Sequence, residues 1–166
     1  DPAGMKLALI GTELSADQPS SVWDASPVPP EHQIRALGSV RLTLREAERT
    51  TRFLSQAFGF QSAGIEDGWQ RLVVGDGKGG QRLELREDPD ARRGSQGTGS
   101  VHHVAFAVPD DPAEAAVRQQ VIAAGGRPTD FIDRFWFHSV YVQEPSGALC
   151  EVATDIPGFA VDEDPQ

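Results

Sequence analysis

The chain has 166 residues, 39% of them hydrophobic and 24% charged, which is the composition of a folded globular protein with one domain or two small, similar units. Its formal net charge of −10 excludes the basic surface that nucleic acids require and disfavours attachment to anionic membranes. The single cysteine, Cys150, has no partner for an internal disulfide, and no apolar run is long enough to span a bilayer, so we expect a cytoplasmic protein.

The first 33 residues do not show the pattern of a complete module. Residues 1–12 read as a turn followed by a short apolar strand, and they mirror the turn and strand over 144–152. We therefore expect residues 1–12 to be the terminal strand of a preceding module that is missing from this sequence. Residues 13–33 are rich in Ser, Pro and Asp, which is typical of a linker.

Residues 34–88 carry the pattern of one strand, one helix and three strands. Alternating side chains predict a strand over 34–44, and the apolar stripe that follows indicates a helix that Gly59 ends. Glycine turns separate three further predicted strands, which cover 61–65, 69–74 and 81–86.

Residues 99–154 repeat the same order. The strand 101–108 leads into a helix, for which Asp110 or Asp111 is the predicted cap, with Pro112 in its first turn. Gly125-Gly126 stops this helix. The remaining predicted strands cover 128–134, 136–143 and 148–153, and residues 155–166 form a C-terminal tail.

This internal repeat predicts an α+β fold of paired βαβββ modules. Aligning the two copies places Ser39 opposite His103. It also places Glu84 opposite Glu151. The first module therefore has no imidazole where the second has one, and we interpret Glu84 as an ion-paired strand residue.

Two predicted strands of the second module carry imidazole and carboxylate groups among apolar side chains: His102 and His103 in the first, and Glu151 in the last. Burying such groups without partners costs roughly 1–3 kcal/mol each. Two interpretations stay open. The groups form a hydrogen-bonded pair, or they are ligands of a metal such as Fe(II), with Mn or Zn as alternatives.

The segment 99–110, GSVHHVAFAVPD, resembles the vicinal oxygen chelate superfamily, which includes glyoxalases, extradiol dioxygenases and bleomycin- and fosfomycin-resistance proteins. Later segments resemble one branch, the ring-cleaving dioxygenases that act on hydroquinones. These segments are DFIDR at 130–134, SVYVQEPSG at 139–147 and EVATDIPGFAVDE at 151–163.

The resemblance implies an Fe(II)-dependent enzyme of aromatic compound degradation that opens hydroquinone or catechol-like rings with O2. It implies that His103 and Glu151 are metal ligands and that His102, Arg134 and Tyr141 are second-sphere and substrate-contacting catalytic residues. The family also uses a third ligand, a His of the N-terminal half, and no residue here matches that position. We therefore expect this chain to be a C-terminal half that works with its missing N-terminal half, with another copy of itself, or with both.

Each assigned role has an alternative. Arg134 can instead pair with Asp130 or Asp133, and Tyr141 can instead be a core-facing aromatic. His102 is expected to point away from His103, because neighbouring side chains alternate on an extended strand. At the level of the whole protein, the alternatives are a glyoxalase-like isomerase or lyase that uses Zn or Ni, and a metal-free binding protein for aromatic molecules or drugs.

Overall fold

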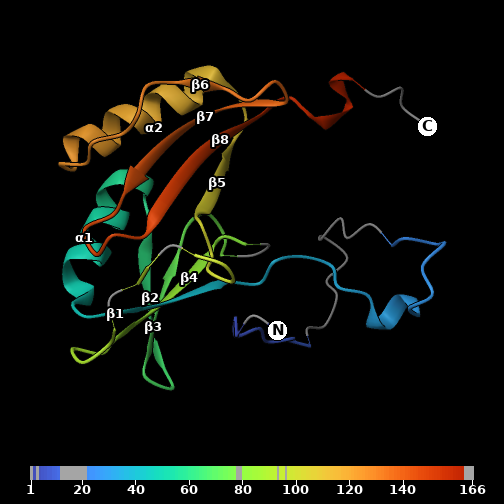
Figure 1. Ribbon diagram of the computed structural model, residues 1–166, viewed down its shortest axis with the longest axis horizontal. Helices are drawn as coiled ribbons and strands as arrows, with labels where there is room; N and C mark the ends of the chain where they lie inside the picture. Colours follow the sequence, from blue (N-terminus) through green and yellow to red (C-terminus); the bar gives the residue numbers. More distant parts are fainter. Residues whose placement is uncertain are drawn as a thin grey trace.

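The computed structural model describes residues 2, 4–11, 22–77, 80–92, 94–95 and 97–162, and these contain two βαβββ modules (Figure 1). The first module consists of β1 (Val40–Leu44), α1 (Ala47–Phe58), β2 (Gln61–Glu66), β3 (Trp69–Val73) and β4 (Arg82–Glu87). The second consists of β5 (Val104–Val108), α2 (Asp111–Ala123), β6 (Ile132–Asp133), β7 (Phe137–Gln143) and β8 (Leu149–Pro157). Two short 3-10 helices, η1 (Pro30–His32) and η2 (Phe159–Val161), flank the modules.

The two sheets share one topology, with strand orders β1-β4-β3-β2 and β5-β8-β7-β6. In each sheet the first strand runs parallel to the last, and the other pairs are antiparallel. The register places Arg41 opposite Glu84 in the first sheet and Ala105 opposite Glu151 in the second. Glu84 and Glu151 therefore occupy equivalent positions, and the predicted α+β fold of paired βαβββ modules is confirmed.

The C-terminal end of α1 and the N-terminal end of α2 follow local sequence signals. α1 ends at Gly59, whose φ of 74° is a left-handed conformation that glycine adopts without a side-chain clash. α2 begins after Asp110, whose carboxylate accepts a hydrogen bond of 2.9 Å from the backbone N–H of Ala113. Among the described residues, no helix combines the length and the apolar character needed to cross a membrane.

Three predicted strands differ from the structure. The strand expected over 34–44 begins only at Val40, and the strand expected over 128–134 shrinks to Ile132–Asp133. Residues 4–11 form no strand and belong to neither sheet. Residues 12–21 of the N-terminal segment and 163–166 of the tail lie outside the described residues, so the predicted linker is seen only from residue 22 onward.

The modules meet where α1 of the first module packs against α2 and against the sheet of the second module. One hydrophobic cluster lies within the first module, and a second joins both modules. The second cluster consists of Phe53 and Ala57 from α1, Val121 from α2, Val142 from β7 and Cys150 from β8. Burial raises the pKa of the Cys150 thiol to about 12, so it is a structural core residue, as its position on the strand predicted.

Glu114 of α2 has a carboxyl group that is buried without a hydrogen-bond partner among the described residues. It is 1% exposed, and within the described part of the chain neither carboxylate oxygen has a hydrogen-bond partner. Burial raises the pKa of Glu114, an effect that His138 opposes and Asp111 reinforces. The unfolded chain releases this proton more readily than the folded one, so the free energy of unfolding falls as the pH rises through the range between the two pKa values.

We expect Glu114→Met to stabilise the protein by about 1–3 kcal/mol at pH 8, because it removes a buried carboxylate without a partner and keeps a good helix former. The gain should shrink as the pH falls toward 4, where the wild-type carboxyl is protonated. Urea unfolding at several pH values measures this. Glu48→Met, at an exposed position of α1, is the control, and an equal gain at every pH would contradict the prediction.

Candidate metal centre

The strand register directs one imidazole and one carboxylate to the same face of the second sheet. β5 lies parallel to β8 with Ala105 opposite Glu151. His103 stands two residues before Ala105, immediately ahead of β5. The His103 imidazole lies on the face of the sheet that carries Glu151.

The two predicted ligands are in direct contact. His103 Nε2 lies 2.8 Å from Glu151 Oε2, and the Glu151 side chain is only 4% exposed while that of His103 is 33% exposed. The other carboxylate oxygen, Oε1, accepts a hydrogen bond from the hydroxyl of Tyr141, which lies opposite Glu151 on β7. Both oxygens of this buried carboxylate therefore have partners, which offsets the cost of removing it from water.

The remaining predicted site residues extend this network. An Nη of Arg134 lies 3.4 Å from the Tyr141 hydroxyl, and His102 Nδ1 lies 2.8 Å from His103 Nδ1. One of these two ring nitrogens must donate a proton and the other accept, so the contact couples the tautomers of the two imidazoles. The structure thus brings all five predicted residues into one chain of contacts.

The expected orientation of His102 is wrong. Residues 101–103 precede β5 and are not held in the extended ladder, so their side chains do not alternate, and the two imidazoles meet instead of pointing apart. The alternative ion pairs of Arg134 are also not formed. Asp130 lies 3.5 Å from Arg118, and the Asp133 carboxylate accepts a 2.7 Å hydrogen bond from the backbone of Phe135.

The equivalent position in the first module has a different chemistry. Glu84 is also buried, but its carboxylate contacts Arg41 Nε at 2.5 Å and lies 3.7 Å from Arg71 Nε. Two guanidinium groups therefore neutralise it, and the interpretation of Glu84 as an ion-paired residue is confirmed. It offers no donor pair comparable to that of the second module.

The geometry of His103 and Glu151 fits a shared metal ion. Two ligands at about 2.1 Å from one ion and about 90° apart lie about 3 Å from each other, close to the 2.8 Å separation of Nε2 and Oε2. Within the described residues, no three His, Cys, Asp or Glu side chains are grouped so that they could hold a metal. These residues therefore supply two ligands, and a two-His, one-carboxylate set requires one more imidazole.

Thr129 is a residue of this region that the sequence pattern did not single out. Its hydroxyl accepts a 3.0 Å hydrogen bond from the backbone N–H of Tyr141, and its own N–H donates to the Tyr141 carbonyl at 2.9 Å. A side-chain oxygen thus replaces the carbonyl of a regular strand, which explains why β6 is shorter than predicted. Thr129 fixes the backbone from which the Tyr141 hydroxyl reaches Glu151.

Comparison with known proteins identifies the class. The family model of the Glyoxalase/Bleomycin resistance protein/Dioxygenase superfamily matches residues 36–152, and the chain belongs to this superfamily. The match includes both modules and both predicted ligands. The predicted resemblance to this superfamily is therefore confirmed.

Several relatives are named ring-cleaving dioxygenases. One, MhqA of Bacillus subtilis (strain 168), is 35% identical over 98% of this chain and 53% of its own length. Another, the chlorohydroquinone/hydroquinone 1,2-dioxygenase of Sphingobium indicum, is 35% identical over 93% of this chain and 49% of its own length. The chain thus spans about half the length of the curated relatives it matches.

A solved structure supports the same fold. A crystal structure described as that of a dioxygenase from Bacillus subtilis aligns with a TM-score of 0.76 and 29% identity, over 87% of this chain and 46% of the other.

We expect Thr129→Val to release the Tyr141 amide, because valine has the same shape but no acceptor. Amide hydrogen exchange at Tyr141 should become at least about tenfold faster, whereas Thr129→Ser, which keeps the hydroxyl, should leave it protected. The internal control is the backbone amide of His138, which lies on β7 like Tyr141 and donates to the hydroxyl of Thr154 on β8. Equal protection in the Val and Ser variants would show that the hydroxyl does not hold this strand.

Proposed function

We propose that this chain is the metal-bearing half of an Fe(II)-dependent, extradiol-type dioxygenase that opens hydroquinone or catechol-like rings with O2. The observation that carries the proposal is the 2.8 Å contact between His103 Nε2 and the buried Glu151 Oε2. The relative named chlorohydroquinone/hydroquinone 1,2-dioxygenase supports the substrate class. The net charge of −10 and the single buried cysteine support a cytoplasmic location.

In this proposal His103 and Glu151 hold the ion. Bound Fe(II) would supply adjacent open positions at which a phenolate oxygen and O2 are brought together. The Tyr141 hydroxyl holds Glu151 Oε1, and Oε2 lies beside His103 Nε2, so these two atoms would face the ion together. His103 is one-third exposed, and its open edge is the side from which a substrate approaches.

His102 orients His103. A metal-binding imidazole usually has its second ring nitrogen held by a hydrogen-bonding partner, which fixes the ring and its tautomer. Here His103 Nε2 faces Glu151, and Nδ1 of the same ring contacts His102 Nδ1 at 2.8 Å. His102 is therefore a positioning residue for His103 as well as a candidate for contact with the substrate hydroxyl.

Tyr141 and Arg134 supply proton transfer and positive charge. The Tyr141 hydroxyl is placed between Glu151 and the Arg134 guanidinium, and the guanidinium also lies over the Tyr141 ring, 5.5 Å from its centre. A fixed cation beside a phenol stabilises negative charge that develops on a nearby oxygen. The pair is thus suited to hold a substrate oxygen and to exchange its proton.

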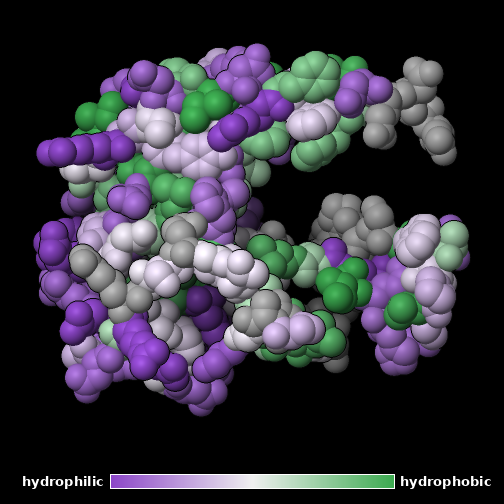
Figure 2. All heavy atoms as spheres, viewed as in Figure 1, coloured by the Kyte–Doolittle hydropathy of each residue, from purple (hydrophilic) through white to green (hydrophobic). Residues whose placement is uncertain are grey.

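The third ligand is proposed to come from another unit of the same fold, supplied by a longer protein or by a second copy. The chain spans about half of its relatives, and Figure 2 shows hydrophobic side chains on the surface of this face. Leu9 in the N-terminal segment is 86% exposed, and Phe159 near the C-terminus is 74% exposed. Burial of these side chains against another unit would remove their apolar surface from water.

We expect anaerobic Fe(II) titration of the complete protein to show one iron bound per protein chain. His103→Ala and Glu151→Ala should each weaken binding by at least about 100-fold, because each removes a direct ligand, and each should abolish iron-dependent O2 uptake with hydroquinone. Glu84→Gln is the matched control, since Glu84 has the equivalent position in the first sheet. Wild-type activity in either ligand variant would refute the assignment.

Activity and binding measurements on the same protein separate the dioxygenase from the two alternative functions. Substrate turnover with Zn or Ni and without O2 consumption would indicate a glyoxalase-like isomerase or lyase. Binding of aromatic molecules that a chelator does not weaken would indicate a metal-free binding protein. Fe(II) affinity of the 166-residue chain alone shows whether the third ligand lies outside it.

A further inference from the structure

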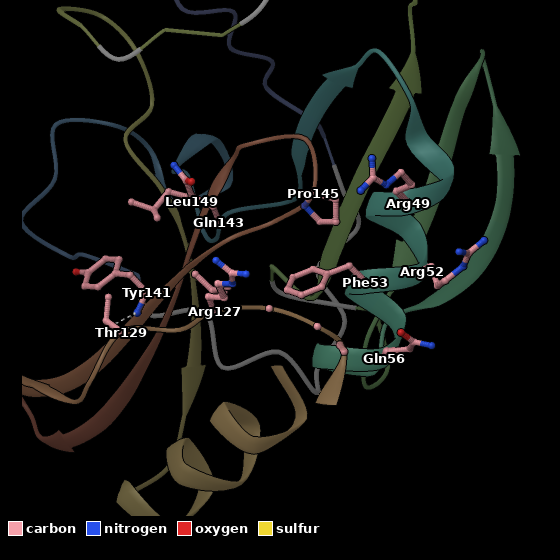
Figure 3. A pocket seen from close by; sticks show the side chains of 14 residues that line it. Arg49, Arg52, Phe53, Gln56, Arg127, Thr129, Tyr141, Gln143, Pro145 and Leu149 are labelled. Carbon is pink, nitrogen blue, oxygen red and sulfur yellow. Dashed lines mark hydrogen bonds between the residues drawn. The ribbon is translucent and has the colours of Figure 1, made fainter. Parts of the chain in front are cut away.

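A groove of about 630 Å³ lies where the two modules meet, and neither predicted metal ligand lines it. One wall is α1 of the first module, and the other is formed by the segment after α2, by β7 and by the turn that follows β7. Figure 3 shows the Phe53 ring in the middle of this groove, with Arg127 on one side and the α1 residues Arg49 and Arg52 on the other. The volume is within the range of small-molecule sites.

The groove is cationic in an acidic protein. Three arginines line it, and no Asp or Glu occurs among its described lining residues. Arg52 is paired with Glu48 at 2.6 Å. Arg49 and Arg127 form no ion pair within the described part of the chain. The sequence holds 25 acidic and 15 basic residues, so a groove with two unneutralised guanidiniums is a local reversal of the overall charge.

The floor of the groove is apolar and belongs to the core. Phe53 and Val142 are 5% and 2% exposed, and both belong to the core cluster that joins the modules. Gly126 lies against this floor: a Cβ there would come within 3.0 Å of the Phe53 ring and 2.8 Å of Val121. The glycine therefore lets the chain press onto Phe53, and this close approach brings Arg127 to the edge of the floor.

We propose that this groove binds a planar organic carboxylate. The guanidinium of arginine matches the two oxygens of a carboxylate, and a flat apolar body can lie against the accessible apolar lining, Pro145 and Leu149, beside Phe53. A bare inorganic anion would use the arginines but leave the floor uncovered. The inference stands on the groove alone and does not require the proposed oxygenase activity.

Two sources of such an anion differ in shape. One is an aromatic acid. The other is the acyclic acid that ring opening produces: breaking the bond between a hydroxyl-bearing carbon and its neighbour, with both atoms of O2 incorporated, gives one carboxylic acid and one aldehyde. This acid is ionised at neutral pH, while the parent phenol is not. Tyr141 borders the groove and bonds Glu151, so the groove and the candidate metal centre share one residue.

Isothermal titration of the iron-free protein, without substrate, tests the proposal with three probes: benzoate, the acyclic monocarboxylate sorbate, and phosphate. We expect the double variant Arg49→Ala/Arg127→Ala to weaken binding of the organic acids at least about tenfold. The double variant Arg45→Ala/Arg92→Ala changes the charge equally at exposed positions outside the groove and should change affinity less than twofold. Thermal unfolding confirms that both variants fold.

Benzoate binding without sorbate binding would support an aromatic acid, and the reverse would support the ring-opened acid. Phosphate that binds as tightly as either organic acid would overturn the proposal, because the apolar floor would then contribute nothing. The proposal also fails if no probe binds or if both double variants lose affinity equally. These measurements use neither iron nor O2, so their failure is distinct from a failure of the oxygenase proposal.

Discussion

The burial of one carboxylate controls the chemistry of the second module. Glu151 lies on a central strand of its sheet with almost no exposure to water, and a charge in that position is stable only if its oxygens are partnered. The partners come from both neighbouring strands: Tyr141 from β7, and His103 from the residue just before β5. Register is therefore the decisive constraint, because a shift of one residue would turn these side chains to opposite faces.

The two modules show two solutions to the same constraint. At equivalent positions Glu84 faces Arg41 across the parallel strand pair, whereas Glu151 faces Ala105. A guanidinium fills the first site and neutralises its carboxylate. An alanine leaves the second site open, so that the imidazole of His103 can approach from two residues earlier. Both modules have a buried carboxylate at this position, and the smaller side chain of Ala105 leaves space beside Glu151 that the Arg41 side chain fills beside Glu84.

Local signals made most of this fold predictable, and long-range packing accounts for the rest. Gly59 and the Asp110 cap set helix ends through contacts within a few residues, and the alternation of the strands located Glu151 on its sheet. The contact between His102 and His103 was not predictable, because it depends on where β5 begins to pair. The cationic groove was equally hidden, because it forms only when α1 packs against the segment after α2.

That junction also links the groove to the candidate metal centre mechanically. Thr50 of α1 is fully buried and donates its hydroxyl to Glu144 in the turn between β7 and β8, and the same carboxylate accepts backbone hydrogen bonds from Ser146 and Ala148. This turn connects the strand of Tyr141 to the strand of Glu151. A helix of the first module thus holds the two strands that build the site of the second, because a buried carboxylate cannot give up its partners without a large loss of stability. Any movement of α1 that changes the groove must therefore also act on this turn.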